Sequence, residues 1–242
     1  MLDFPFNPLK RSQKVERFVL KDGKRLYYRF RAAPYYGGIA TADAIGCSFL
    51  CAYCWNYYRN LNPARFDRFY SPHQVASKLL KIADRNAFHK FRITGSEPIL
   101  GESSFDHLIE VYELIAQERR HFVFILETNG FFLGYKTELI KKIKFKKNLW
   151  IRICLKGVDE DSFELITGAE KEYFQYPFIA LRELERQGFM AWPAVMRDLF
   201  EGRELDKLRK ILFEHKIEAR LEEEYLEAYP FVLENMKKRG VI

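Results

Sequence analysis

The sequence has no long apolar run, and this absence narrows the class of protein. No stretch approaches the ~20 consecutive apolar residues that a membrane-spanning helix needs. The N-terminal segment MLDFPFNPLKRSQK lacks the apolar core of a signal peptide. No internal repeat or low-complexity segment is present. We therefore expect a soluble, cytoplasmic protein that does not associate with a membrane.

Cysteine is also scarce, and its distribution is uneven. The chain has 4 cysteines among 242 residues, and three of them lie close together. In a cytosolic protein such clustering favours metal binding or catalysis over disulfides.

The net charge of +7 fits an anionic partner such as RNA, a phosphorylated small molecule or an acidic protein. A lysine-rich solvated surface would give the same net charge.

From residue 39 onward, short apolar runs alternate with amphipathic stretches. This alternation predicts βαβ units and a parallel sheet, and therefore an α/β fold. Strands are expected at 39–45, 91–94, 122–126, 149–155, 189–196 and 217–221. Helices are expected at 71–82, 103–116, 136–146, 177–187, 203–214 and 230–239.

The N-terminal part of the chain has a different pattern. Asp22-Gly23 separates two runs at 17–20 and 25–30, which is a hairpin signal. We expect residues 1–36 to form a small β-hairpin appendage. Residues 37–242 would then form the core domain with a C-terminal helical segment.

The three clustered cysteines are Cys47, Cys51 and Cys54, spaced C-x3-C-x2-C after the first core strand. Iron–sulfur clusters normally take four cysteine ligands, so three ligands leave one iron open to another molecule. Structural zinc would need a fourth Cys or His, typically in a second pair, and no histidine has that spacing. A closed electron-transfer cluster would want a fourth nearby cysteine. The spacing therefore favours a cluster with an open iron.

Polar motifs follow two further predicted strands. Gly95, Ser96 and Glu97 follow the second strand, and the Glu97 carboxylate suits an ammonium group. Glu127 and Asn129 belong to a Glu-Thr-Asn-Gly segment after the third strand. Each segment alone could be an ordinary turn. In parallel barrels, however, the chemistry gathers at the carboxyl ends of the strands, so their shared position favours a functional site.

The fourth strand places Arg152, Cys154 and Lys156 on one face, because side chains alternate along a strand. The two cations suit a carboxylate or an anionic substrate. Cys154 is also explained as a small buried hydrophobic residue. Residues 196–198 end the fifth strand and are candidates to line the same cavity, although methionine commonly serves as core packing.

Together these motifs resemble the radical S-adenosylmethionine (SAM) superfamily, whose hallmark is C-x3-C-x-aromatic-C, with Tyr53 as the aromatic residue. The resemblance implies a partial (β/α)6 barrel holding a [4Fe–4S] cluster on the three cysteines. It also implies that SAM binds the open iron and is cleaved reductively to methionine and a 5′-deoxyadenosyl radical, which takes hydrogen from a substrate. Tyr53 is then expected near the adenine, and the segment 95–97 near the SAM amino group.

The motif set is most similar to the pyruvate-formate-lyase-activating enzymes, which are glycyl-radical-enzyme activases. That similarity implies hydrogen abstraction from a glycine of a protein partner, with an electron donor such as ferredoxin or flavodoxin. It also implies that Glu127 and Asn129 lie near the ribose and carboxylate of SAM, with Lys156 as a carboxylate partner. Ser96, Glu127 and Cys154 differ from the activase pattern. Because a thiol is a poor ligand for a hard cation, the monovalent-cation site of the activases is not expected here.

Two other functions remain open from the sequence. Radical modification of RNA is favoured by the positive net charge. A non-enzymatic Fe–S electron carrier is the alternative from another class, and it would not need the motifs around Glu97, Asn129 and Lys156. The resemblance covers residues 39–221. The two ends of the chain lie outside it and are the parts expected to distinguish the substrate.

Overall fold

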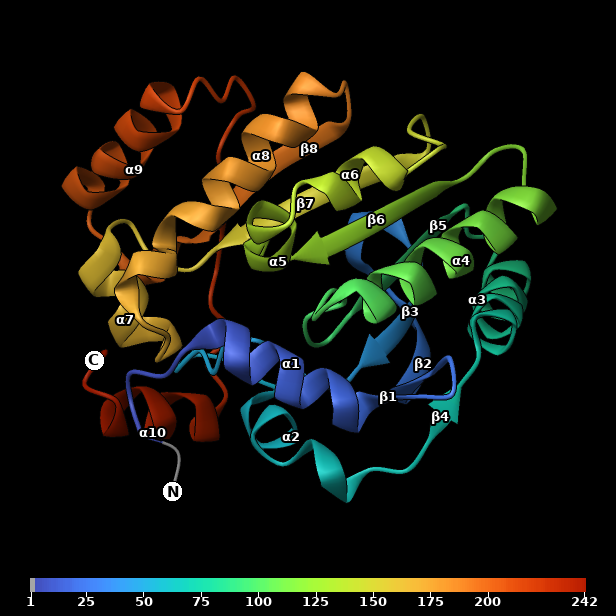
Figure 1. Cartoon of the computed structure of the whole chain (residues 1–242), viewed down its shortest axis with the longest axis horizontal. Coiled ribbons are helices and arrows are strands. Elements are labelled where there is room, and N and C mark those ends of the chain that lie inside the picture. The colour runs from blue at the N-terminus through green and yellow to red at the C-terminus, as the bar shows by residue number, and fades with distance from the viewer. Residues whose placement is uncertain (1–2) are drawn as a thin grey trace.

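The computed structural model describes residues 3–242 and has an α/β architecture (Figure 1). A 9-stranded sheet runs in the order β1-β2-β3-β5-β6-β7-β8-β9, with β4 paired to β2. Consecutive pairs from β3 to β9 along this order are parallel. The parallel strands are β3 (Ile39–Ala44), β5 (Lys90–Thr94), β6 (Val123–Thr128), β7 (Leu149–Leu155), β8 (Met190–Met196) and β9 (Glu222–Glu224). The predicted partial (β/α)6 barrel is confirmed.

Strand alternation separates an apolar outer face from a polar interior. Phe91, Phe124 and Ile151 are fully buried and belong to the core between the sheet and the helices. The next residue along a strand points the other way, so Arg92 after Phe91 and Arg152 after Ile151 point into the barrel. The parallel strands therefore enclose a polar interior to which several strands contribute side chains.

The connecting helices agree with most of the sequence prediction. α3 begins as expected, with Ser71 as N-cap and Pro72 at the first helical position. The connecting helices are α3 (Pro72–Asn86), α4 (Glu102–Glu118), α5 (Phe131–Tyr135), α6 (Glu138–Lys142), α7 (Glu160–Thr167), α8 (Tyr176–Arg186) and α9 (Gly202–Glu214). The helix expected at 136–146 is shorter than predicted. Only α6, Glu138–Lys142, lies in that range, and the separate helix α5 precedes it. An added Cβ on Gly134 of α5 would lie 1.8 Å from the Tyr176 carbonyl oxygen, so α5 packs directly on α8.

The last strand lies further along the chain than predicted. Residues 217–221 were expected to form it, but β9 is Glu222–Glu224. Its inward residues Glu222 and Glu224 pair with Arg152, and the outward Glu223 pairs with Arg209. Ion pairs with arginines on both faces of the strand, rather than an apolar alternation, select this segment.

The N-terminal hairpin is present, but its predicted first arm is wrong. Residues 17–19 complete the helix α1 (Pro8–Val19), which Asn7 caps and whose buried side chains include Val15 and Val19. The hairpin joins β1 (Leu20–Lys21) to β2 (Lys24–Ala33) through the left-handed residues Asp22 and Gly23, with φ of 49° and 71°. β2 pairs antiparallel with β3 and so extends the barrel sheet. The division of the chain at residue 36 stays a prediction.

Segments near the two ends of the described chain are in contact. The remaining elements are α2 (Tyr57–Leu61), β4 (Phe69–Tyr70) and α10 (Pro230–Lys238). Arg239, which follows α10, places its Cζ 4.0 Å from the centroid of the Phe4 ring. Figure 1 shows α1, α2 and α10 on the same side of the molecule. The sheet stays open between its β2 and β9 edges, and after those strands the Tyr35 hydroxyl donates to Glu227 Oε1 at 2.8 Å. Within residues 3–242, no helix combines the length and apolar character that a membrane crossing requires.

His107 of α4 ties this helix to the N-terminal hairpin. Its Nδ1 lies 3.2 Å from the Gly23 carbonyl, and its Nε2 lies 3.2 Å from the Tyr27 hydroxyl. The carbonyl can only accept, so Nδ1 carries the proton and Nε2 accepts from the tyrosine. This is the neutral imidazole. Burial lowers the pKa of His107 to about 4.

A pH dependence of stability follows from the lowered pKa of His107. The unfolded chain binds a proton near pH ~6.5 and the folded chain does not, so this contribution to stability is lost as pH falls. Between about pH 7.5 and about pH 5.5 the loss should be about 1 kcal/mol. Urea denaturation at each pH measures it. His107→Gln should flatten the dependence, whereas His73→Gln, at an exposed site on α3, should not; equal slopes for both variants would contradict the assignment.

Candidate active site

The three cysteines lie on a segment, residues 45–56, that has no helix or strand. None of them forms a disulfide. Burial raises the pKa of Cys47 to about 12 and that of Cys54 to about 11. Cys51 raises the pKa of Cys47 further, and Cys47 raises that of Cys54, because each thiolate would repel the other. Each of these two thiols therefore lies within electrostatic range of another cysteine of the segment, while their role as cluster ligands stays a prediction.

The peptide groups of this segment bind partners far away in the sequence. The N–H groups of Leu50 and Ala52 donate to the carbonyls of Thr167 and Ile166 at the end of α7, at 3.0 and 2.8 Å. The Ala52 carbonyl oxygen accepts from the side-chain amide of Asn235 of α10 at 2.6 Å.

Two arginines from opposite chain ends complete this support. Arg11 of α1 donates to the Cys47 carbonyl at 3.2 Å, and Arg239 donates to the Leu50 carbonyl at 3.0 Å. Neither arginine nor Asn235 carried a signal in the sequence, because their partners are backbone groups of another segment. Both ends of the chain thus hold the cysteine segment in place.

Two backbone N–H groups point at sulfur. Phe49 N lies 3.4 Å from Cys47 Sγ, and Asn56 N lies 3.3 Å from Cys54 Sγ. Hydrogen bonds to sulfur stabilise the thiolate and tune the reduction potential of a cluster. These two N–H groups therefore favour the thiolates that a cluster would bind and act against the effect of burial.

The contact between Asn235 and Ala52 is open to a matched test. Asn235→Ala leaves a buried carbonyl without a donor, which should lower the free energy of unfolding by about 1–3 kcal/mol and speed iron loss to a chelator. Asn86→Ala is the control, since Asn86 also donates to a backbone carbonyl but on an exposed part of α3. It should cost less than about 0.5 kcal/mol. Equal losses in the two variants would show that α10 does not support the segment.

The loop after β5 lies against the cysteine segment. Gly95 has a φ of +85°, and an added Cβ there would lie 3.3 Å from the Asp43 Cα. Asn56 donates to the Gly95 carbonyl at 2.6 Å and to Ser96 Oγ at 2.9 Å. Ser96 in turn donates to Asn60 Oδ1 at 2.7 Å. The serine that replaces the second glycine of the family pattern therefore has a partner set of its own.

Glu97 joins the loops after β5 and β6. Its Oε1 accepts from Ile99 N at 2.9 Å and from Thr128 Oγ1 at 2.6 Å, and its Oε2 accepts from Asn129 N at 2.8 Å. Burial raises the pKa of Glu97, although these donors favour its ionised form. The Asn129 amide donates to Ser48 at 2.9 Å, next to Cys47. Glu97 and Asn129 are thus brought to the cysteines, while their contact with SAM stays a prediction.

Charged side chains of alternating sign line the barrel interior. Glu127 pairs with Arg92 at 2.9 Å and accepts from Thr94 and from Tyr36. Burial opposes the charge of Glu127, but Arg92 and these donors hold its pKa below the usual value. Arg152 pairs with Glu222 and Glu224 and donates to Cys154 at 3.3 Å. The predicted shared face of Arg152, Cys154 and Lys156 agrees with this contact. Arg152 is already neutralised by glutamates that the sequence did not connect to it.

Lys156 is the cation that remains beside the cysteines. Its Nζ lies 5.4 Å from the centroid of the Tyr53 ring. None of the ion pairs among residues 3–242 involves Lys156. The Tyr53 hydroxyl is buried and has no hydrogen-bond partner in the described part of the chain. A cation and a phenol without partners at one place suit a polar ligand.

One part of the predicted lining is wrong. Arg197 pairs with Glu223 at 3.3 Å, and Asp198 accepts from Leu226 N at 2.6 Å. Glu223 is on the outward face of β9, so Arg197 does not line the barrel interior. The chain turns into a short 3-10 helix, Arg197–Leu199, directly after β8, which breaks the strand alternation on which the prediction rested.

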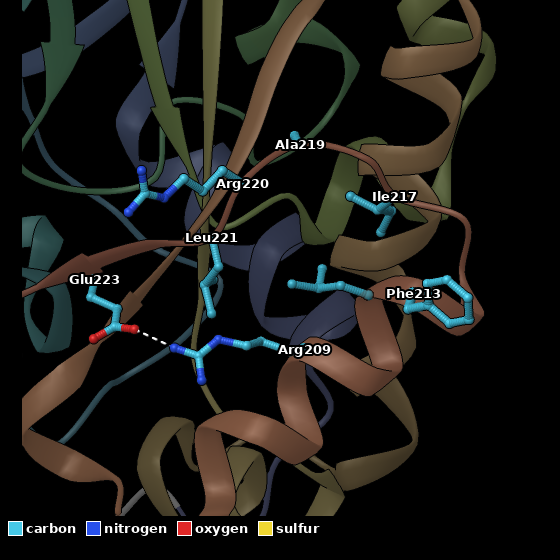
Figure 2. A pocket seen from close by; sticks show the side chains of 8 residues that line it. Arg209, Phe213, Ile217, Ala219, Arg220, Leu221 and Glu223 are labelled. Atoms are coloured by element: carbon cyan, nitrogen blue, oxygen red, sulfur yellow. Dashed lines mark hydrogen bonds and ion pairs between the residues drawn. The ribbon is translucent and has the colours of Figure 1, made fainter. Parts of the chain in front are cut away.

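A separate hollow lies on that outer face. It has a volume of about 340 Å³ and is bordered by α9 and residues 217–223. Figure 2 shows Arg209 extended toward Glu223, with Phe213 and Ile217 on the other side of the hollow. Glu223 borders the hollow and points away from the barrel, whereas Glu222 and Glu224 point into the barrel. The hollow is therefore separate from the cysteine site.

The donor set fits an iron–sulfur cluster with one open iron. No three His, Cys, Asp or Glu side chains of residues 3–242 converge as ligands of a single metal ion. A [4Fe–4S] cluster needs a wider arrangement, because each thiolate binds a different iron. Three cysteines within eight residues, N–H groups aimed at two of the sulfur atoms, and a lysine without an ion pair in the described part of the chain fit that arrangement.

Comparison with known proteins agrees with this geometry. The "Radical SAM superfamily" family matches residues 44–214. A GTP 3′,8-cyclase of Microcystis aeruginosa is 26% identical over 144 residues, which cover 59% of this chain and 42% of the cyclase. A putative glycyl-radical enzyme activating enzyme of Methanocaldococcus jannaschii is 28% identical over 132 residues, covering 54% of this chain and 45% of that protein. The chain thus spans less than half the length of these relatives.

Solved structures show the same fold at low identity. A spore photoproduct lyase variant with bound AdoMet and dinucleoside spore photoproduct has a TM-score of 0.65 and 15% identity, covering 87% of this chain and 63% of that one. Native anSMEcpe with bound AdoMet has a TM-score of 0.53 and 16% identity, covering 75% and 49%. The family match spans most of the chain. The protein therefore belongs to the radical SAM superfamily, whose enzymes use a [4Fe–4S] cluster and SAM.

Proposed function

We propose that Cys47, Cys51 and Cys54 bind the [4Fe–4S] cluster of this enzyme, and that the enzyme abstracts hydrogen from a macromolecular substrate. The observation that carries the proposal is a segment after the first parallel strand that holds three neighbouring cysteines, with backbone N–H groups aimed at two of the sulfur atoms and a cation free of ion pairs close by. When bound, the cluster and SAM supply a 5′-deoxyadenosyl radical. An electron donor such as ferredoxin or flavodoxin belongs to the proposal.

The residues around the thiols have distinct proposed roles. Lys156 attracts the SAM carboxylate as a charge-assisted donor, and Tyr53 lies against the adenine. The loop 95–97 faces the SAM amino group, with Glu97 fixing this loop to Asn129. Glu127 and Arg152 shape the polar wall of the cavity through their pairs with Arg92 and Glu222.

A glycine of a protein partner is one candidate substrate. The similarity to a putative glycyl-radical enzyme activating enzyme supports it. RNA is the second candidate, which the net charge of +7 supports. For either, the open edge of the barrel between β2 and β9 gives a large molecule access from the side.

The ligand assignment predicts a strict dependence on the cysteines. After anaerobic reconstitution with iron and sulfide, Cys51→Ala should lack cluster absorbance and form no 5′-deoxyadenosine with SAM and a strong reductant. Cys154→Ala is the matched control and should retain the iron content of the unmodified protein. Mass spectrometry of the nucleoside and iron analysis provide the readouts. A Cys51→Ala protein that holds a cluster and cleaves SAM would refute the assignment.

The role of Lys156 is tested by SAM affinity. Lys156→Ala removes one charge-assisted contact, so the dissociation constant for SAM should rise about tenfold, equivalent to ~1.4 kcal/mol. Equilibrium dialysis with the reconstituted protein measures it. Iron content should not change. Lys210→Ala on the exposed face of α9 should bind SAM normally, and an unchanged affinity in Lys156→Ala would remove this lysine from the site.

A further inference from the structure

Arginine and aromatic side chains alternate on the surface next to the cysteine segment. The half-buried Tyr28 ring has two guanidinium groups close to it, with Arg59 Cζ 4.7 Å and Arg29 Cζ 5.5 Å from its centroid. Arg29 Cζ is also 5.8 Å from the Trp55 ring, and the two rings meet edge to face at 6.4 Å. Together with Arg31, these residues form what we call the arginine–aromatic surface.

This surface has more positive than negative charge. The buried carboxylate of Asp43 accepts from Arg29 Nε at 2.6 Å and from Arg31 Nε at 2.8 Å, so two cations share one anion. The side chains of Arg29 and Arg31 are 45% and 24% exposed, whereas that of Asp43 is 0% exposed. Arg59 donates to the neutral Asn56 amide at 3.1 Å. Three guanidinium groups, each at least partly exposed, therefore lie near two carboxylates, the buried Asp43 and Glu227 beside Arg31.

The arginine–aromatic surface borders the site of the proposed chemistry. Trp55 directly follows Cys54 in the sequence. Asn56, the partner of Arg59, donates to the Gly95 carbonyl and to Ser96 in the loop after β5. Asp43 contacts the same loop at Gly95. A molecule bound on this surface therefore lies next to the loops that we assign to the cluster and SAM.

We propose that the arginine–aromatic surface docks single-stranded RNA and so names the substrate class of the proposed function, on which this inference rests. Guanidinium groups bind phosphate oxygens in a fork geometry, and aromatic rings stack on unpaired bases. An acidic protein would pair with the arginines but would leave the rings without a role. Base stacking requires bases outside a duplex, which favours a loop or a single strand.

RNA binding to the reconstituted holoenzyme tests the proposal. Fluorescence anisotropy with a labelled single-stranded RNA oligonucleotide at several salt concentrations gives the affinity and its salt slope. Three phosphate contacts give a slope near about −2, and Arg59→Gln should reduce its magnitude by about 0.7. Trp55→Leu should weaken binding about fivefold or more through lost stacking. Cluster absorbance of each variant shows that the fold and the site are intact.

The matched control is Arg85→Gln, which removes an exposed arginine from α3, away from this surface. Equal effects of Arg59→Gln and Arg85→Gln would overturn the proposal in favour of general electrostatic attraction. Unchanged affinity in both Arg59→Gln and Trp55→Leu would also overturn it. A poly-glutamate peptide that binds as tightly as the RNA and displaces it would also overturn the proposal. That result would assign the surface to an acidic protein instead.

The docking and the proposed function fail separately. Formation of 5′-deoxyadenosine by the unmodified protein without RNA reports on SAM cleavage alone. RNA affinity and its dependence on Arg59 and Trp55 report on docking alone. Cleavage without Arg59-dependent RNA binding would overturn the docking and keep the proposed function, and the reverse result would do the opposite.

Discussion

The site depends on satisfying the peptide groups of a segment that has no regular secondary structure. Buried N–H and C=O groups without partners are costly, and the loop that presents three thiols cannot supply its own. Partners come from α7 and from both chain ends, through Arg11, Asn235 and Arg239. The family match at residues 44–214 includes none of these three residues. The parts of the chain that are least like its relatives therefore support the part that is most like them.

The sequence was sufficient for the strands and for the thiols, because both leave local patterns. Apolar runs gave five of the parallel strands at nearly their observed positions, and the C-x3-C-x2-C spacing led to the cysteine segment. β9 was misplaced because its three glutamates have no apolar pattern, and pairing with Arg152 and Arg209 determines its position. The contact between Arg239 and Leu50 spans 189 residues and involves a backbone carbonyl, so no periodicity could reveal it.

The interior charges show that residue type and position on a strand do not identify which side chains are available to bind a ligand. Arg92, Glu127, Arg152 and Glu222 alternate in sign across β5, β6, β7 and β9, so most of the charge is cancelled within the barrel. In a low-dielectric interior, an uncompensated charge is costly and a paired one is tolerated. Arg152 and Lys156 looked equivalent in the sequence, since both lie on one face of β7. The structure separates them, because the glutamates of β9 reach only the arginine.

The open edge of the sheet has a consequence for the directions from which the interior can be reached. The hydrogen bond from Tyr35 to Glu227, which joins the segments after the two edge strands, is exposed and contributes on the order of 1 kcal/mol. A single bond of that size breaks easily, so it does not lock the edges together. In a closed parallel barrel the interior is reached over the carboxyl ends of the strands. Here the unsealed edge adds an approach from the side, so a bound molecule can extend past the rim of the sheet in that direction.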